Sequence, residues 1–143
     1  MTKSHDDLMA GFAGESQANR RYLAFANKAE AEGYTQVARL FRAVAQAETV
    51  HALNHFRRAG EVKSTEENLQ VAIAGEHYEN SEMYPAFIND AEAEGNTQAK
   101  MSFHYANEAE KVHESLYREA LGALSAPTGE EYDYYICPVC GHT

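Results

Sequence analysis

The two halves of this sequence repeat one another. The residues NKAEAEG at positions 27–33 recur as NDAEAEG at positions 89–95, and AETVH at 47–51 recurs as AEKVH at 109–113. Both halves are rich in residues that favour helix, and glycines fall where helices are expected to end. The repeat therefore predicts a duplicated helical hairpin.

Four long helices are expected. Breaks are predicted at Gly33, Gly60 and Gly95, with a final stop near Pro127. Each helix would then hold roughly 25 to 30 residues, well above the usual mean of about 11 to 12. Long helices with short connections are typical of bundles, so we expect an all-α four-helix bundle in residues 1–126.

The repeat also contains one insertion. Glu15 follows a glycine, as Glu76 does in the second half, but this match has an offset one residue shorter than that of the other motifs. One extra residue must therefore lie in the third helix between Glu76 and Tyr84. A helix can absorb such an insertion as a π-bulge, which often occurs at functional sites.

Charge and hydropathy exclude several classes of partner. The formal net charge of −10 argues against binding nucleic acid or an anionic membrane surface. No apolar run approaches the length needed to span a bilayer, so no membrane segment is expected. The first residues also lack the apolar stretch of a signal peptide. We therefore expect a cytoplasmic protein.

Two E-x-x-H motifs carry the chemistry: Glu48 with His51, and Glu110 with His113. Positions i and i+3 share one face of a helix, so each pair can direct a carboxylate and an imidazole at one point. A single motif of this kind in a glutamate-rich helix is more often a solvated glutamate beside an ordinary histidine. Two motifs at matching positions of a duplicated hairpin favour a metal site.

The other two helices offer further carboxylates. Glu15 and Glu76 occupy equivalent positions, and Glu79 stands on the same helix face as Glu76. Known di-iron and di-manganese bundles combine an E-x-x-H motif from each of two helices with a glutamate from each of the others. Apolar residues flank both motifs, where carboxylates are costly to desolvate unless they are paired or bind metal. The sequence therefore predicts a two-metal site.

These motifs resemble those of the rubrerythrin family, within the ferritin-like superfamily. The resemblance rests on FAGESQA at 12–18, AETVH at 47–51, AGEHYE at 74–79 with MYP at 83–85, and EKVH at 110–113. It implies a ferritin-like fold and a pair of iron ions. The ligands implied for the oxidised pair are Glu15, Glu48, Glu76, Glu79, Glu110 and His113.

The resemblance assigns roles to three further residues. His51 matches a residue that replaces the Glu79 position as a ligand when the iron is reduced, and Tyr22 and Tyr84 match tyrosines that hydrogen-bond near the cluster. Glu79 has no counterpart in the first half, where Ala18 or Asn19 occupies the same face. Carboxylate suits ferric iron and imidazole suits ferrous iron, so the asymmetry is consistent with such an exchange.

The resemblance also implies a function. Rubrerythrins reduce hydrogen peroxide to water in oxidative-stress defence, with electrons that arrive from reduced pyridine nucleotide through partners such as rubredoxin or a reductase. The alternatives are a ferroxidase, which oxidises ferrous iron with dioxygen or peroxide, and an iron-binding or storage protein on the same scaffold. Manganese and zinc accept the same ligands, so the residues alone do not select iron.

The tail, residues 127–143, departs from the family pattern. Cys137 and Cys140 in CPVCG resemble the first knuckle of a rubredoxin module, which holds one iron with four cysteines, but a second knuckle is absent. One chain therefore cannot complete that site, although two chains sharing four thiolates could hold iron or zinc. A relic or a truncated segment is favoured over a shared site. In that case electrons must come from a separate carrier.

The link between the hairpins is short. In a ferritin-like bundle the second and third helices run parallel, so the chain must return along the bundle between Glu48 and Glu76. Helices extending about 18 Å beyond each ligand make this return on the order of 36 Å. Residues 60–66 reach at most about 25 Å when extended. We therefore predict a domain-swapped homodimer, in which hairpins from two chains complete each bundle.

Overall fold

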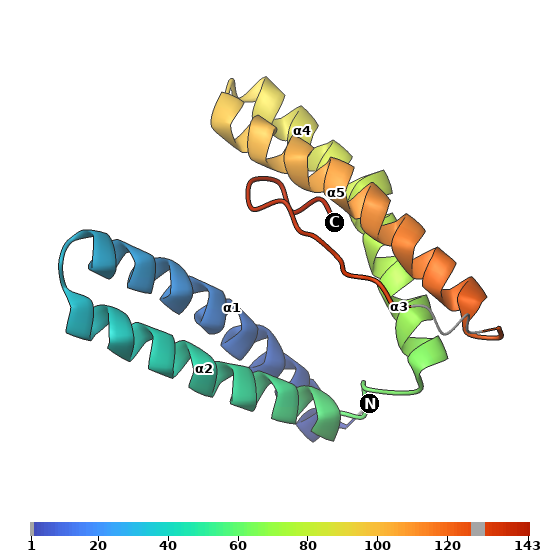
Figure 1. Cartoon of the computed structure of the whole chain (residues 1–143), viewed down its shortest axis with the longest axis horizontal. Helices are drawn as coiled ribbons and strands as arrows, with labels where there is room; N and C mark the ends of the chain where they lie inside the picture. Colours follow the sequence, from blue (N-terminus) through green and yellow to red (C-terminus); the bar gives the residue numbers. More distant parts are fainter. Residues whose placement is uncertain (1, 127–130) are drawn as a thin grey trace. The chain divides into compact units, whose positions relative to one another are not determined.

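The computed structural model describes residues 2–126 and 131–143. Its helices are α1 (Lys3–Ala31), α2 (Thr35–Arg58), α3 (Thr65–Tyr78), the π-helix η1 (Glu79–Met83), α4 (Tyr84–Ala93) and α5 (Thr97–Ala123) (Figure 1). No strand occurs among the described residues, so the predicted all-α class is confirmed. The chain before Ser64 and the chain from Ser64 onward form two compact units, and each is described by itself.

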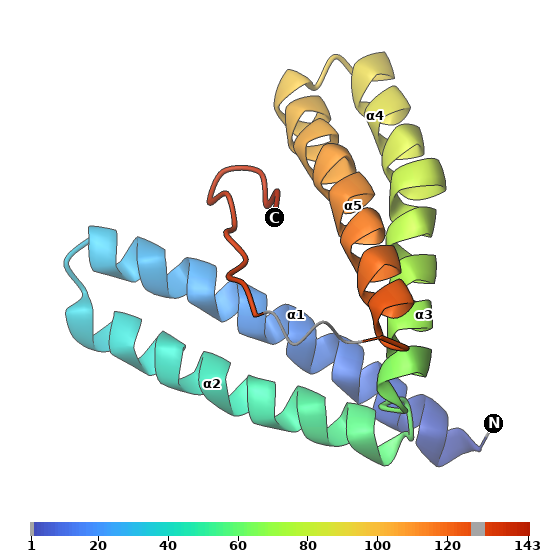
Figure 2. The same cartoon turned by 45° about the vertical axis from the view of Figure 1, so that its right-hand side comes forward.

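The first unit is an antiparallel hairpin of α1 and α2 (Figure 2). The two helices pack along a seam of alanines. Ala26, Ala38 and Ala45 are almost completely buried. Because the distance between two helix axes depends on the side chains at their contact, these small residues let α1 and α2 approach closely. Thr2 caps the start of α1 by accepting a hydrogen bond from the backbone N–H of His5.

The three glycines that were predicted to break the helices all end a helix in the left-handed region. Gly33, Gly60 and Gly95 have φ values of 84°, 81° and 69°, a conformation that a Cβ atom disfavours. The backbone N–H of Gly33 donates to Glu30, and that of Gly95 donates to Glu92. Each thereby satisfies a carbonyl that the end of a helix leaves without an intrahelical partner. The predicted breaks are confirmed.

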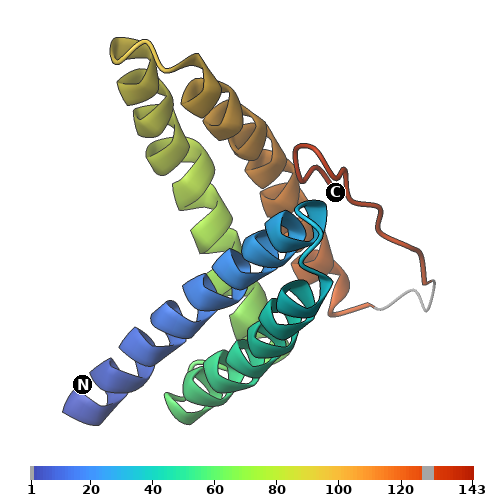
Figure 3. The ribbon, with the colours of Figure 1, turned by 90° about the vertical axis from the view of Figure 1, so that its left-hand side faces the viewer.

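The second unit is an antiparallel hairpin in which α3, η1 and α4 form one rod beside α5 (Figure 3). Ser64 and Glu67 form a capping box at the start of α3, each accepting the other's backbone N–H through its side chain. The S-x-x-E spacing of Ser64 and Glu67 is the sequence signature of such a box. Asn96 caps α5 by accepting the N–H of Ala99 at 3.1 Å.

The inserted residue of the second half is absorbed in η1. The predicted π-turn lies at Glu79–Met83, where the N–H of Tyr84 donates to the carbonyl of Glu79, five residues earlier. Pro85 follows in the first turn of α4, a helix position at which proline is common. The equivalent helix of the first half, α1, is α-helical throughout. The π-bulge prediction is therefore confirmed.

An aromatic triad occupies the same place in both hairpins. Tyr22, Phe25 and Phe41 have ring centroids 5.6 to 6.3 Å apart in the first. Their repeat equivalents in the second, Tyr84, Phe87 and Phe103, lie 5.4 to 6.4 Å apart. Tilted and edge-on aromatic pairs at these distances stabilise a core beyond the area that they bury. The duplication thus extends from the sequence to the packing.

Each unit, taken alone, leaves large apolar side chains exposed. Leu40 and Val50 of α2 are about three-fifths exposed, Val71 of α3 is about two-thirds exposed, and Met101 of α5 is about half exposed. No helix within residues 2–126 or 131–143 is long and apolar enough to cross a membrane.

The C-terminal segment forms a closed turn. The N–H of Cys137 donates to the carbonyl of His142 at 2.8 Å, and the N–H of Gly141 donates to the carbonyl of Cys137 at 3.0 Å. Gly141 has a φ of 79°, which the turn requires. Helix α5 ends at Ala123, and the predicted stop at Pro127 lies outside the described residues.

Candidate metal centre

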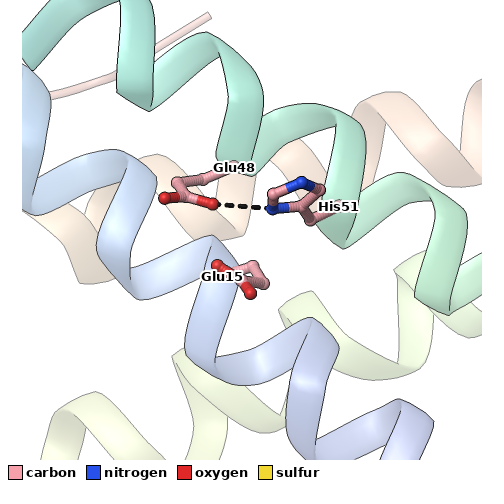
Figure 4. Close-up of side chains that lie close together, drawn as sticks. All are labelled: Glu15, Glu48 and His51. Carbon is pink, nitrogen blue, oxygen red and sulfur yellow. Dashed lines mark hydrogen bonds and ion pairs between the residues drawn. The ribbon is translucent and has the colours of Figure 1, made fainter. Parts of the chain in front are cut away.

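The first hairpin gathers three of the predicted ligands. Glu15 of α1 and Glu48 and His51 of α2 place one ligand atom each within 4.8 Å of one another (Figure 4). His51 and Glu48 lie one turn apart on α2, and the Nδ1 atom of His51 is 2.9 Å from a carboxylate oxygen of Glu48. Glu15 faces them from the neighbouring helix. The carboxylate and the imidazole of this E-x-x-H motif are therefore directed at one point, as their spacing predicts.

The second hairpin repeats this arrangement. Glu76 of α3 and Glu110 and His113 of α5 also place ligand atoms within 4.8 Å of one another. The Nδ1 atom of His113 lies 2.6 Å from a carboxylate oxygen of Glu110. The side chain of Glu110 is 15% exposed and that of His113 is 25% exposed. This group is the more enclosed of the two, since His51 is 56% exposed.

Burial, and then crowding of the carboxylates, raises the pKa values of Glu76 and Glu79 at the second group. Burial, a hydrogen bond to Glu110 and the charge of Glu110 together raise the pKa of Glu76 to about 7. The pKa of Glu79 is raised by burial first and then by the charge of Glu110. Because a bound cation would reverse these effects, the metal-free group is destabilised by the same charges that would hold a metal ion.

The donors present fit a pair of iron ions. Two carboxylates and one imidazole converge in each hairpin, and this mixture of oxygen and nitrogen donors suits iron, manganese and zinc. The imidazoles present Nδ1 to their own group, leaving Nε2 to face away from it. Each hairpin therefore supplies half of the ligand pattern that carboxylate-bridged metal pairs use.

Comparison with known proteins decides the family. A family model described as rubrerythrin matches residues 6–121. The chain is 39% identical to rubrerythrin-2 of Clostridium acetobutylicum over 96% of its length and 83% of that protein. It is 38% identical to nigerythrin of Nitratidesulfovibrio vulgaris, over 96% of its length and 74% of that protein. This chain belongs to the rubrerythrin family.

Solved structures agree with this assignment. Fully reduced, all-ferrous nigerythrin matches with a TM-score of 0.55 and 36% identity, covering 99% of this chain and 76% of that one. The mixed-valent state of nigerythrin matches with a TM-score of 0.54 and 38% identity, over the same shares of both chains. The chain therefore has the ferritin-like fold, and it is a di-iron oxidoreductase of the peroxidase type.

The rubrerythrin pattern includes residues that the two ligand groups do not contain. Glu79 lies in η1, outside the group formed by Glu76, Glu110 and His113, although it interacts electrostatically with Glu110 and His113. The pKa of Tyr84 is raised by burial and then by the charges of Glu79, Glu110 and Glu76. Its hydroxyl therefore stays protonated beside the carboxylates.

Tyr22 belongs to the aromatic triad of the first hairpin, and its role at a metal centre stays a prediction.

The tail contacts one of the predicted ligands. The Nε2 atom of His113 lies 2.9 Å from the hydroxyl oxygen of Thr143 and 3.2 Å from the carbonyl oxygen of Gly141. The pKa of the Cys137 thiol is lowered by hydrogen bonds from the backbone at Val139 and Cys140 and then from the Cys140 side chain. Both cysteines are free, so the knuckle presents two thiols on a turn that is already formed.

Sequence reasoning missed a second repeated feature beside the ligands. In the first helix of each hairpin, an asparagine follows the predicted ligand glutamate by four residues, as Asn19 after Glu15 and Asn80 after Glu76. Asn80 donates to Glu114, whose pKa is lowered to about 2 by hydrogen bonds from Asn80 and then Arg118. The shared spacing in the two halves was the signal that could have identified these residues.

Proposed function

We propose that this chain reduces hydrogen peroxide to water at a di-iron centre built from both hairpins. Convergence of a glutamate and an E-x-x-H pair in each hairpin carries the proposal. The proposed ligands of the oxidised centre are Glu15, Glu48, Glu76, Glu79, Glu110 and His113. His51 is proposed to take the place of Glu79 when the centre is reduced.

The reduction of one peroxide molecule to two water molecules consumes two electrons and two protons. The two iron ions, when bound, supply the two electrons. The carboxylates of Glu76 and Glu110 would balance the charge of the metal ions, and Glu76 would have to lose its proton to act as a ligand, since its pKa is raised to about 7 in the metal-free group. The Tyr84 hydroxyl, kept protonated by the surrounding carboxylates, can donate a hydrogen bond to the substrate.

The asymmetry between the hairpins supports peroxide reduction over storage. Glu79 is an additional carboxylate in the second hairpin, and Ala18 stands at the equivalent position of the first. A centre with one more ligand than it uses at a time can change its donors between oxidation states: carboxylate favours ferric iron and imidazole favours ferrous iron. Crystal structures with identical coordination in both oxidation states would contradict this exchange.

A domain-swapped homodimer is proposed as the active assembly. Helix α2 ends at Arg58 and α3 begins at Thr65, so only residues 59–64 can carry the chain back along a bundle. For ligands at one height this return is about 30 Å at 1.5 Å of rise per helical residue. Six residues bridge at most about 25 Å. The exposed apolar side chains of each hairpin support a partner from a second copy.

The dimer is tested by light scattering combined with metal analysis of the same sample. A particle of twice the chain mass that carries two metal ions per chain is expected. A monomer that retains its full metal content would contradict the swap.

The tail is proposed to be separate from the metal-binding domain, and the electron donor is proposed to be another protein. Residues 1–126 would form the metal-binding domain and residues 127–143 a tail. Cys137 and Cys140 supply half of a four-thiolate site, so an iron or zinc ion there would need two more thiolates from a second chain. Electrons would come from rubredoxin or a reductase in the cytoplasm. Replacing both cysteines with serine should leave the metal content of the two ligand groups unchanged.

The function is tested by anaerobic purification, metal quantification and stopped-flow mixing. We expect two iron ions per centre and re-oxidation of the diferrous protein by hydrogen peroxide much faster than by dioxygen. Faster reaction with dioxygen, with turnover of added ferrous iron, would favour a ferroxidase. Accumulation of far more than two iron ions per centre would favour storage.

A further inference from the structure

Glu114 is the centre of a polar network on the outer side of the second ligand group. It follows His113 on α5 and accepts hydrogen bonds from the Nδ2 atom of Asn80 at 2.7 Å and the Nε atom of Arg118 at 3.0 Å. The Nδ1 atom of His77 lies 3.3 Å from the same carboxylate. The Glu114 side chain is only 15% exposed, so the carboxylate is held from three directions.

The same network reaches the point where α3 becomes a π-helix. The Nδ2 atom of Asn80 also donates to the backbone carbonyl of Glu76 at 2.7 Å. The hydroxyl of Ser81 donates to the carbonyl of His77 at 2.6 Å. The side chains of two successive residues of η1 therefore donate hydrogen bonds to backbone carbonyls of the preceding turn. A π-turn disturbs the regular backbone hydrogen bonds of a helix at this point.

The first hairpin shows what the equivalent asparagine does without a π-turn. Asn19 donates to the carbonyl of Ala45 at 2.6 Å and to the hydroxyl of Thr49 at 2.8 Å, both on α2. It thus joins α1 to α2, and α1 stays α-helical. Ala52 stands at the position equivalent to Glu114. The carboxylate and the π-turn therefore occur together in one hairpin and are both absent from the other.

We propose that Glu114 is a positioning residue that holds the π-turn and, with it, the Glu79 carboxylate beside the second ligand group. Glu79 immediately precedes Asn80 in η1, so the bond from Asn80 to Glu114 restrains the backbone that carries Glu79. The carboxylate of Glu114 lies outside the group of Glu76, Glu110 and His113. Its two oxygens are engaged by Asn80 and Arg118, so it acts through Asn80.

The assignment of Glu79 as a ligand rests on the proposed function, whereas the anchoring of the π-turn does not. The first test therefore uses the metal-free full chain and measures amide hydrogen exchange in residues 79–83. Glu114→Ala should accelerate exchange there by about tenfold, the factor that loss of one hydrogen bond to a charged acceptor implies. Exchange in α1 and α2 should stay unchanged.

Glu108→Ala is the matched control. Glu108 lies on the same helix, is exposed and forms an ion pair with Lys111. The groups that interact with its carboxylate, Lys111 and His104, both lie on α5 and not in η1. Unchanged exchange in residues 79–83 of Glu114→Ala, or equal acceleration in Glu108→Ala, would overturn the proposal. Asn80→Ala should remove the same hydrogen bond. Amide exchange in residues 79–83 of the double variant should therefore be no faster than in either single variant.

The second test measures cobalt(II) binding to the metal-free chain by its visible absorption. The wild-type chain should bind two ions per centre. Glu114→Ala should bind the same number of ions and show an altered cobalt spectrum. Its affinity for one of the two ions should fall about 10-fold to 100-fold, the loss that is typical when a residue supporting a metal ligand is removed. Affinity and spectrum equal to those of wild type would overturn the positioning role. Failure of the wild-type chain to bind two ions would instead count against the proposed function.

Discussion

The two hairpins of this chain repeat one another but differ where Glu79 and Glu114 stand in the second. In the first, α1 is a regular α-helix and Ala18 stands where the second hairpin has Glu79. In the second, η1 interrupts the rod between α3 and α4 and carries Glu79 into the region of the ligand group. One inserted residue thus changed the helix type and accompanied one additional carboxylate. The aromatic triads, by contrast, kept similar distances between their rings.

Duplication of the hairpin explains some features of the proposed centre and leaves others unexplained. A glutamate and an E-x-x-H pair converge in both hairpins, and duplication alone accounts for this. Glu79, the π-turn and the Glu114 network occur in the second hairpin only. We infer that the shared residues bind the metal pair and that the unshared ones make its two halves chemically different.

The largest expected effect comes from the shared carboxylates. Glu48→Ala and Glu110→Ala should each reduce peroxide reduction by more than about 100-fold, because loss of a direct ligand exceeds the loss of an outer-shell partner. Metal analysis of the purified variants and stopped-flow rates measure this. Equal losses would support two equivalent half-sites. A variant with normal metal content and normal rate would remove its glutamate from the ligand set.

The next effect tests the asymmetry. Glu79→Ala gives the second hairpin the residue type that the first has at Ala18. We expect two bound metal ions but peroxide reduction slower by roughly 10-fold to 100-fold, since the exchange of donors would be lost. Ala18→Glu in the same background should not restore the rate, because α1 lacks the π-turn. Full restoration would show that the position of the extra carboxylate is unimportant.

The stability of the metal-free protein should depend on pH through Glu76. Its pKa is about 7 in the folded chain and starts from an ordinary value of 4.5. Between these values the folded chain keeps a proton that the unfolded chain has lost, so stability should fall as pH rises through this window. Thermal unfolding at pH 5.5 and 7.5 measures the change. Glu76→Gln should reduce it, and an undiminished dependence in that variant would assign it to other groups.

The smallest effect should be the same in both hairpins. Gly33→Ala and Gly95→Ala introduce a Cβ atom at φ values of 84° and 69°. Beyond the adjoining residues, neither added Cβ would meet an atom within 4 Å. The only cost is the left-handed backbone, about 1 to 2 kcal/mol for each. Chemical denaturation measures both. If one substitution lowered the free energy of unfolding several times more than the other, the two turns would not be equivalent.

The sequence alone determined the local features of this protein. Helix breaks at Gly33, Gly60 and Gly95 and a π-bulge between Glu76 and Tyr84 were predicted and are present. These features depend on residues near one another along the chain, where backbone preferences and side-chain spacing act directly. The ligand pairs also follow from spacing, because positions i and i+3 must share a helix face.

Only the tertiary structure decided which side chains outside the predicted ligand set meet across helices. It paired Asn80 with Glu114 and brought His77 to the same carboxylate. It also separated the roles of the two equivalent asparagines, since Asn19 bonds to α2 and Asn80 bonds to α5 and its own helix. Such contacts depend on the rotation of each helix about its axis and on its distance from its neighbour. Packing sets both quantities, and a single inserted residue changes them.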